Sequence, residues 1–238
     1  MTFANDTSAL LLAAARNNAE WCADVCRRHA FSGSVWSSPR RTPPLYPDAV
    51  TLTPEASAAE VLGRIDTVSP GCSVKDSFAA LDLTPAGFRV LFEAQWIHRP
   101  AGAAAPAGAT DGRLEWSEVE STGELSAWEA AWDGEESTGL FHPGLLTEGI
   151  VFLAGRDAEG VIVAGAVAST GGGVVGVSNL FAVDDADTDE AWAAVLAAVG
   201  ARWPGLPVVG YEAGDDLAAA VRAGFGPLGP LRVWLHTA

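Results

Sequence analysis

A low-complexity segment in the middle of the chain constrains its fold more than any other feature. Residues 100–112 consist of alanine, glycine and proline, with one threonine and one aspartate near the end. Such a composition offers no apolar pattern to bury and is typical of a linker. We therefore expect an N-terminal α+β region of unknown role at 1–99, an Ala/Gly/Pro linker at 100–112 and a second domain at 113–238.

The second domain alternates between strand and helix patterns. Its apolar periodicity predicts strands at 114–119, 149–155, 161–169, 174–183, 208–212 and 231–236, and helices through Trp128 and Trp132, at 186–203 and at 215–223. The order β-α-β-β-β-α-β-α-β is typical of an α+β fold, with a mixed, mostly antiparallel sheet flanked by helices.

The N-terminal region has shorter and less regular patterns. We expect a helix at 9–29, an extended proline-rich connector at 37–47, a short helix at 56–66, a further helical turn at 73–80 and a strand at 87–98. Lys75, the single lysine of the chain, is expected to be solvated in that turn.

Charge is distributed unevenly along the chain. The sequence has 14 basic and 30 acidic residues, a net charge of −16. Residues 1–100 contain 9 basic and 10 acidic side chains, whereas residues 101–238 contain 5 and 20. This balance excludes a basic nucleic-acid surface and a polybasic membrane patch. It favours a cationic amine as a substrate, because the field would attract one.

The cysteines indicate a reducing compartment. Three cysteines are too few, and odd in number, for a disulfide framework, and neither a signal peptide nor an apolar run of about 20 residues is evident, so we expect a cytoplasmic protein. Cys22, Cys26 and His29 would share one helix face, as metal ligands can. We favour a buried apolar stripe and expect no metal, because structural zinc needs four ligands.

Two stretches carry a resemblance to a known family. They are Gly176–Val183, and Val209–Glu212 followed by Gly214–Phe225. With the element order, they resemble the GNAT superfamily of acyl-CoA-dependent N-acyltransferases over about residues 113–238. The resemblance implies that the first stretch is the strand whose exposed backbone binds the pantetheine of acetyl-CoA or another acyl-CoA. It assigns this role to Asn179, Leu180, Phe181, Ala182 and Val183.

The chain departs from the family pattern where the pyrophosphate should bind. The resemblance implies a basic, glycine-rich turn at the N-terminus of the following helix, where the free N–H groups and the helix dipole favour an anion. Residues 188–193 contain neither arginine nor glycine, and 184–190 contain five carboxylates. We expect Asp187 to cap this helix with Glu190 at its third position. The helix end would then be neutralised by its own side chains, which compromises the usual mode of cofactor binding.

Acyl transfer to an amine needs a base for the ammonium group and a proton donor for the departing thiolate. The resemblance places Glu212 at the end of a strand beside the cofactor, so Glu212 is the candidate base and Tyr211 the candidate donor. Neighbouring residues of a regular strand point to opposite faces, so both enter one cleft only if a bulge intervenes. In the alternative interpretation, Tyr211 packs in the core and Glu212 is solvated.

Two functions from different classes remain open at this point. The first is a GNAT-like N-acyltransferase that transfers an acetyl or acyl group from acyl-CoA to an amine of a small molecule or a protein. The second is a GNAT-fold binding or regulatory module that no longer uses CoA. A faint similarity of Gly87–His98 to Gly224–His236 suggests that the N-terminal region is a degenerate GNAT-like half.

Overall fold

A computed structural model describes residues 2–28, 30–69, 71–104, 106, 112–134 and 137–237. It divides into two compact units, unit 1 (residues 1–96 and 227–238) and unit 2 (residues 97–226). The boundaries that we expect at 99 and 113 stay a prediction. In the structure, residues 227–238 group with the N-terminal residues. His29 and most of the middle of the linker, 105 and 107–111, lie outside the described residues.

Unit 1 is a sheet with helices and turns around it. Its elements are α1 (Thr2–Cys26), β1 (Phe31–Ser32), β2 (Val35–Ser37), β3 (Ala49–Thr51), α2 (Ala58–Leu62), β4 (Ser73–Asp76), the 3-10 turn η1 (Thr84–Ala86), most of β5 (Phe88–Arg99) and nearly all of β11 (Gly226–His236). The strand order is β1-β2-β3-β4-β11-β5. β3 and β4 are parallel, and β4 pairs antiparallel with β11.

The helical turn expected at 73–80 is wrong, because β4 is a strand. Its Lys75 pairs in register with Val50 on one side and Val233 on the other. Lys75 is 5% exposed and its Nζ donates a hydrogen bond to Asn18 Oδ1 at 3.0 Å. Tertiary pairing on both sides of the strand overrides a local sequence whose polar residues favour a turn.

Unit 2 is a second mixed sheet with three helices among the described residues. Its elements are the end of β5, β6 (Glu115–Glu118), α3 (Thr122–Asp133), the 3-10 turn η2 (Pro143–Leu145), β7 (Ile150–Arg156), β8 (Ile162–Gly171), β9 (Val174–Ala182), α4 (Asp185–Arg202), β10 (Val208–Glu212) and α5 (Gly214–Arg222). The strand order is β10-β9-β8-β7-β6. Only the β10–β9 pair of these is parallel.

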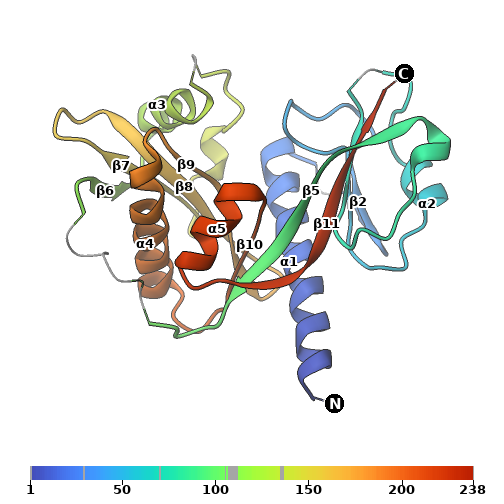
Figure 1. The fold of residues 1–238 in the computed structure, drawn as a ribbon. Coiled ribbons are helices and arrows are strands. Elements are labelled where there is room, and N and C mark those ends of the chain that lie inside the picture. The colour runs from blue at the N-terminus through green and yellow to red at the C-terminus, as the bar shows by residue number, and fades with distance from the viewer. Residues whose placement is uncertain are drawn as a thin grey trace. The chain divides into compact units, whose positions relative to one another are not determined.

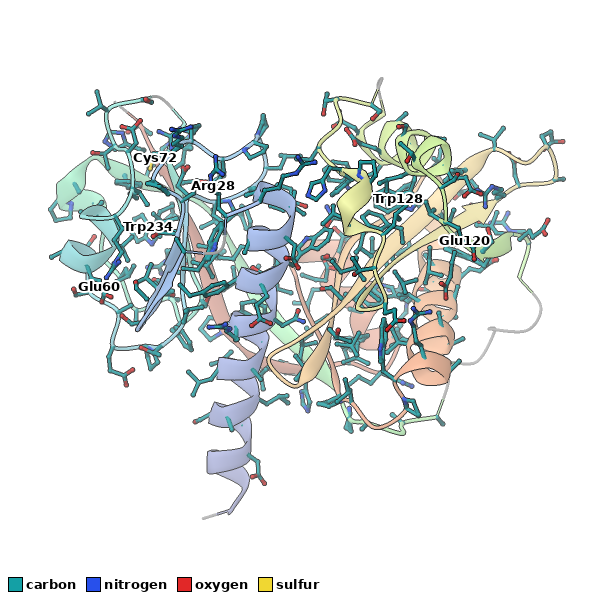
Figure 2. All side chains as sticks on the ribbon, turned by 180° about the vertical axis from the view of Figure 1, so that it is seen from behind. Arg28, Glu60, Cys72, Glu120, Trp128 and Trp234 are labelled. Carbon is teal, nitrogen blue, oxygen red and sulfur yellow. The ribbon has the colours of Figure 1, made fainter. Side chains whose placement is uncertain are left out.

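The sheet of unit 2 has two covered faces (Figure 1). On the face that we call the α4 face, Val177 of β9 and Val208 of β10 pack with Trp192 of α4 in one apolar core, which also includes residues of α5. On the opposite face, the α3 face, Trp128 of α3 lies against the strands (Figure 2). The structure confirms the α+β fold class, a mixed and mostly antiparallel sheet flanked by helices.

No helix among the described residues is long and apolar enough to cross a membrane. Within the same part of the chain, no group of three or more histidine, cysteine, aspartate or glutamate residues is placed to hold a metal ion.

Candidate active site

The parallel strands β9 and β10 separate soon after they meet. Their register comprises two pairs, Val175 with Val208 and Gly176 with Val209. Gly210 comes close to the next residue of β9, because a Cβ at position 210 would lie 3.1 Å from the carbonyl oxygen of Val177. Beyond this point β9 continues to Ala182 and β10 to Glu212, but no further residues of these two strands pair with each other. We call this opening the splay.

A β-bulge lies in β9 at the start of the splay. The register with β8 pairs Gly165 with Phe181 but Val167 with Ser178, so β9 has one extra residue there. Asn179 within this interval has a left-handed φ of 51°, which asparagine tolerates better than most residues. Val177 and Leu180 both face the α4 core, whereas Phe181 contacts Trp128 on the α3 face. The bulge therefore reverses the alternation of β9, as bulges next to functional sites commonly do.

The five residues expected to bind the cofactor do not have equal roles in the structure. Asn179 forms the bulge, while Leu180 and Phe181 send their side chains into opposite packing layers. Ala182 is the last residue of β9. Val183 lies just beyond the strand, and its N–H already donates to the carbonyl oxygen of Val163. Whether these residues bind acyl-CoA stays a prediction.

Glu212 and Tyr211 lie on opposite faces of β10, so they share no face of the sheet and can act on one reactant only if it lies within the splay. Val208 faces the α4 core, so the alternation of a strand puts Glu212 on that face and Tyr211 on the α3 face. Burial raises the pKa of Glu212 to about 8, and the neighbouring Asp216 carboxylate adds to the rise. A carboxyl group with this pKa can accept a proton near neutral pH, which suits a general base.

The acidic N-terminus of α4 is engaged by arginines from elsewhere in unit 2. Asp187 lies inside the first turn and pairs with Arg113, so the expected capping role of Asp187 is wrong. Glu190 accepts hydrogen bonds from the N–H groups of Arg113 and Leu114 at 2.9 Å. Asp189 pairs with Arg222 at the end of α5, at 2.8 Å. These partners come from distant positions in the chain, which local sequence spacing does not reveal.

Glu129 of α3 organises the loop that follows the helix, and sequence reasoning missed it. Glu129 is 1% exposed. It accepts hydrogen bonds from the N–H groups of Thr138, Leu140 and Phe141 at 2.7 to 3.1 Å. Burial alone would raise the pKa of Glu129, but these donors outweigh it and the pKa lies below its usual range. Phe141 in turn stacks edge-on against Trp128, so the loop, α3 and the α3 face form one packed layer.

Replacing Glu129 by glutamine should destabilise the protein by about 1–3 kcal/mol at pH 7, because the amide NH2 cannot accept the hydrogen bonds of one carboxylate oxygen. The lowered pKa means that the carboxylate stabilises the fold above its unfolded-state pKa and loses this effect as pH falls through the folded pKa. The difference between variant and wild type in urea unfolding should therefore shrink in acid. Glu115→Gln, at an exposed position of β6, is the control and should change little.

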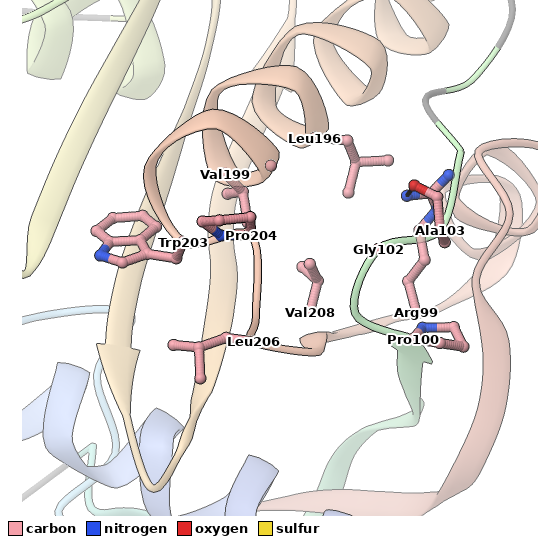
Figure 3. Close-up of a pocket in the computed structure, with 11 residues that line it drawn as sticks. Arg99, Pro100, Gly102, Ala103, Leu196, Val199, Trp203, Pro204, Leu206 and Val208 are labelled. Atoms are coloured by element: carbon pink, nitrogen blue, oxygen red, sulfur yellow. Dashed lines mark hydrogen bonds between the residues drawn. The ribbon is translucent and has the colours of Figure 1, made fainter.

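An apolar cavity of about 170 Å³ lies at the other end of α4 from the acidic cluster. Leu196, Val199 and Trp203 of α4 form one wall, and Arg99 and Ala103 lie opposite (Figure 3). The Arg99 guanidinium is held by the carbonyl oxygens of Ala103 and Ala104. Val208, at the paired start of β10, lines this cavity, but Tyr211, Glu212 and residues 179–183 do not, so the cavity is separate from the candidate active site.

Comparisons with known proteins identify the fold. No family model matches the chain, and no curated protein sequence matches it. Among solved structures, a GCN5-related N-acetyltransferase from Kribbella flavida matches with a TM-score of 0.61 and 16% identity, over 97% of this chain and 96% of that one. A putative GNAT-family acetyltransferase from Novosphingobium aromaticivorans matches with a TM-score of 0.56 and 14% identity, over 87% and 91%.

A conserved protein of unknown function from Staphylococcus epidermidis has a TM-score of 0.53 and 11% identity, over 71% of this chain and 74% of that one. The chain has the GNAT fold, as the sequence resemblance implied. The likeness to the Kribbella structure extends over nearly the whole chain, whereas the sequence resemblance covers only its second half. At these identities the likeness shows the fold alone, because one fold hosts many functions.

Proposed function

We propose that the protein is a GNAT-type N-acyltransferase that moves an acyl group from acyl-CoA to an amine. The observation that carries this proposal is the splay, which ends beside a glutamate whose pKa is raised to about 8. An opening between two strands supplies backbone N–H and C=O groups without ladder partners, which suits the amide-rich pantetheine arm. The bulge at Asn179 lies in β9 at the start of this opening.

The chemistry needs two proton movements. Glu212 takes a proton from the ammonium group, and the resulting amine nitrogen forms a bond to the thioester carbonyl carbon. As the C–S bond breaks, the nitrogen loses its second proton to solvent and the thiolate of CoA takes one from Tyr211, which solvent then restores. The products are the amide and free CoA, with one proton released through Glu212.

The acceptor is proposed to be a cationic amine, on a small molecule or on a protein. Residues 101–238 contain 20 acidic and 5 basic side chains. The resulting negative charge attracts such an acceptor and concentrates it near the site. The same field opposes the polyanionic donor, so the arrangement favours the acceptor at the expense of donor affinity.

The acidic N-terminus of α4 favours a second candidate function, a GNAT-fold module that no longer uses CoA. Asp187, Asp189 and Glu190 already have partners in Arg113, Arg222 and the backbone. A donor pyrophosphate at this helix end would meet carboxylates in place of a basic turn. In this alternative the splay binds a ligand or a peptide without chemistry.

A turnover assay separates the two functions. Acetyl-CoA is mixed with the protein and a panel of primary amines, which includes polyamines, amino sugars and basic peptides, and the CoA thiol is measured with its acetylated product. The proposed acyltransferase releases thiol and forms an amide with at least one amine of the panel. Absence of amide with every amine contradicts the enzyme and supports the binding module.

The acidic cluster predicts an unusual salt dependence. Affinity for acetyl-CoA should rise between about 20 mM and 500 mM salt, because salt screens like-charge repulsion. Asp189→Asn removes one carboxylate and releases Arg222. It should therefore tighten the binding of acetyl-CoA about fivefold at low salt, because one repulsive charge contact contributes about 1 kcal/mol. Calorimetric titration of both proteins measures this.

The control for this prediction is Asp133→Asn at the exposed end of α3, which changes the net charge equally and should leave affinity nearly unchanged. Affinity that falls with salt, as at a basic phosphate site, would show that the cluster does not face the donor.

A further inference from the structure

A serine at the start of the bulge has a buried hydroxyl that lacks a partner. Ser178 Oγ is shielded from solvent and forms no hydrogen bond with the described residues. Buried side-chain oxygens are nearly always hydrogen bonded, so an exception indicates a group that is kept for another partner. Among the described residues of unit 2, the other side-chain atoms in this state belong to His98 and Arg99, at the end of β5.

The position of Ser178 follows from the register of its strand. Val175 and Gly176 pair with Val208 and Val209. Two residues farther along β9, the same parallel register brings Ser178 level with Tyr211. Val177 faces the α4 core, so Ser178 faces the α3 side, where the alternation of β10 also puts Tyr211. Two hydroxyl groups thus flank the opening of the splay on one face, and Glu212 flanks it on the other.

We propose that Ser178 is a further catalytic residue, whose hydroxyl donates a hydrogen bond to the carbonyl oxygen of the acyl group. This inference rests on the proposed acyltransferase function. When the amine nitrogen bonds to the carbonyl carbon, the π electron pair moves to the oxygen, which becomes negative. Ser178 stabilises this charge without giving up its proton, and the pair returns to the C=O bond as the C–S bond breaks. A donor fixed before the reaction is the most effective kind for such charge.

A structural role for Ser178 would have a different signature. A hydroxyl that bonds to nothing in the folded protein contributes no hydrogen bond to its stability, and its removal relieves a buried unsatisfied group. Ser178→Ala should therefore keep or slightly raise the melting temperature. If Ser178 is catalytic, the same variant also has a lower kcat. Melting temperature and kcat together therefore distinguish a catalytic from a structural role.

The matched control is Ser169→Ala on the neighbouring strand β8. Ser169 is also buried, and it lies level with Gly176 of β9. Ser169 takes part in an interaction within the protein, so we expect its replacement to lower the melting temperature and leave kcat unchanged.

The experiment measures kcat, KM for acetyl-CoA and melting temperature for wild type, Ser178→Ala and Ser169→Ala. We expect Ser178→Ala to lower kcat about 100-fold, to change KM less than about threefold and to keep its melting temperature. A wild-type kcat in Ser178→Ala, with an active wild type, overturns the inference and leaves the proposed function standing. An inactive wild type with every amine overturns both.

Discussion

Glutamine at position 212 will lower turnover by a factor of about 100 to 10 000, while the dissociation constant for acetyl-CoA stays the same. The amide cannot accept the proton of the ammonium group, but it preserves the size and polarity of the side chain. Because the pKa of Glu212 is about 8, wild-type kcat/KM should rise with pH and reach half its plateau near that value. The residual activity of Glu212→Gln should lack this rise. Stopped assays between pH 6 and 10, with calorimetric binding at pH 7, measure both quantities.

Asp216→Asn is the matched control for this prediction. Asp216 lies in the first turn of α5, and its negative charge contributes to the raised pKa of Glu212. Without that charge the pKa of Glu212 falls, so the rise in kcat/KM should move to lower pH with the plateau retained. A Glu212→Gln variant with wild-type turnover would remove Glu212 from the role of base.

Alanine at position 128 will destabilise the protein by about 3–5 kcal/mol, the range expected for a fully buried tryptophan. Trp128 is 0% exposed, and its Nε1 donates to the carbonyl oxygen of Leu153 at 2.8 Å. Its ring makes edge-on contacts with Phe152 and Phe181, at 5.1 and 5.3 Å between centroids. Because Phe181 follows the bulge, turnover should fall as well. Urea unfolding followed by circular dichroism gives the stability.

Trp132→Ala serves as the control for this large effect. Trp132 lies one helical turn farther along α3 and is only partly buried, with a ring contact to Phe141 at 5.3 Å. Its loss should cost less than half as much free energy. Equal losses at the two positions would contradict the view that the buried contacts of Trp128 with Phe152 and Phe181 set the size of the effect.

The strands and helices of unit 2 could be read from the sequence because their patterns are long and regular. The helix expected at 186–203 is α4, and the strands expected at 174–183 and 208–212 are β9 and β10. In each element the apolar residues recur with the period of a helix or of a strand, and the local sequence is sufficient to reveal that period. The resemblance to GNAT proteins placed these elements in order, and the solved structures confirm the fold.

Features that depend on distant parts of the chain could not be read in this way. The strand β4 forms because β3 and β11 flank it, and nothing in Ser73–Asp76 alone requires a strand. The partners of Asp187 and Asp189 are Arg113 and Arg222, which are 74 and 33 residues away. Spacing within a helix indicates a cap, but it cannot indicate an ion pair over such a separation.

The bulge in β9 had a weak signal that sequence reasoning passed over. Asparagine is disfavoured in strands and tolerates left-handed φ, so Asn179 in the middle of an apolar strand indicates a break in its ladder. Its consequence is the reversal that sends Phe181, and not Leu180, to the α3 face. The orphan hydroxyl of Ser178 needed the structure, because only the fold shows which polar groups lack partners.

The most direct test of this account is whether acetyl-CoA binds to the folded protein. Thermal unfolding is followed with increasing acetyl-CoA up to millimolar concentration, at low and at moderate salt. A ligand that binds only the folded state stabilises it by about 2.7 kcal/mol at 100 times its dissociation constant. We predict a concentration-dependent rise in melting temperature that is larger at moderate salt. No rise at either salt concentration would contradict the acyltransferase.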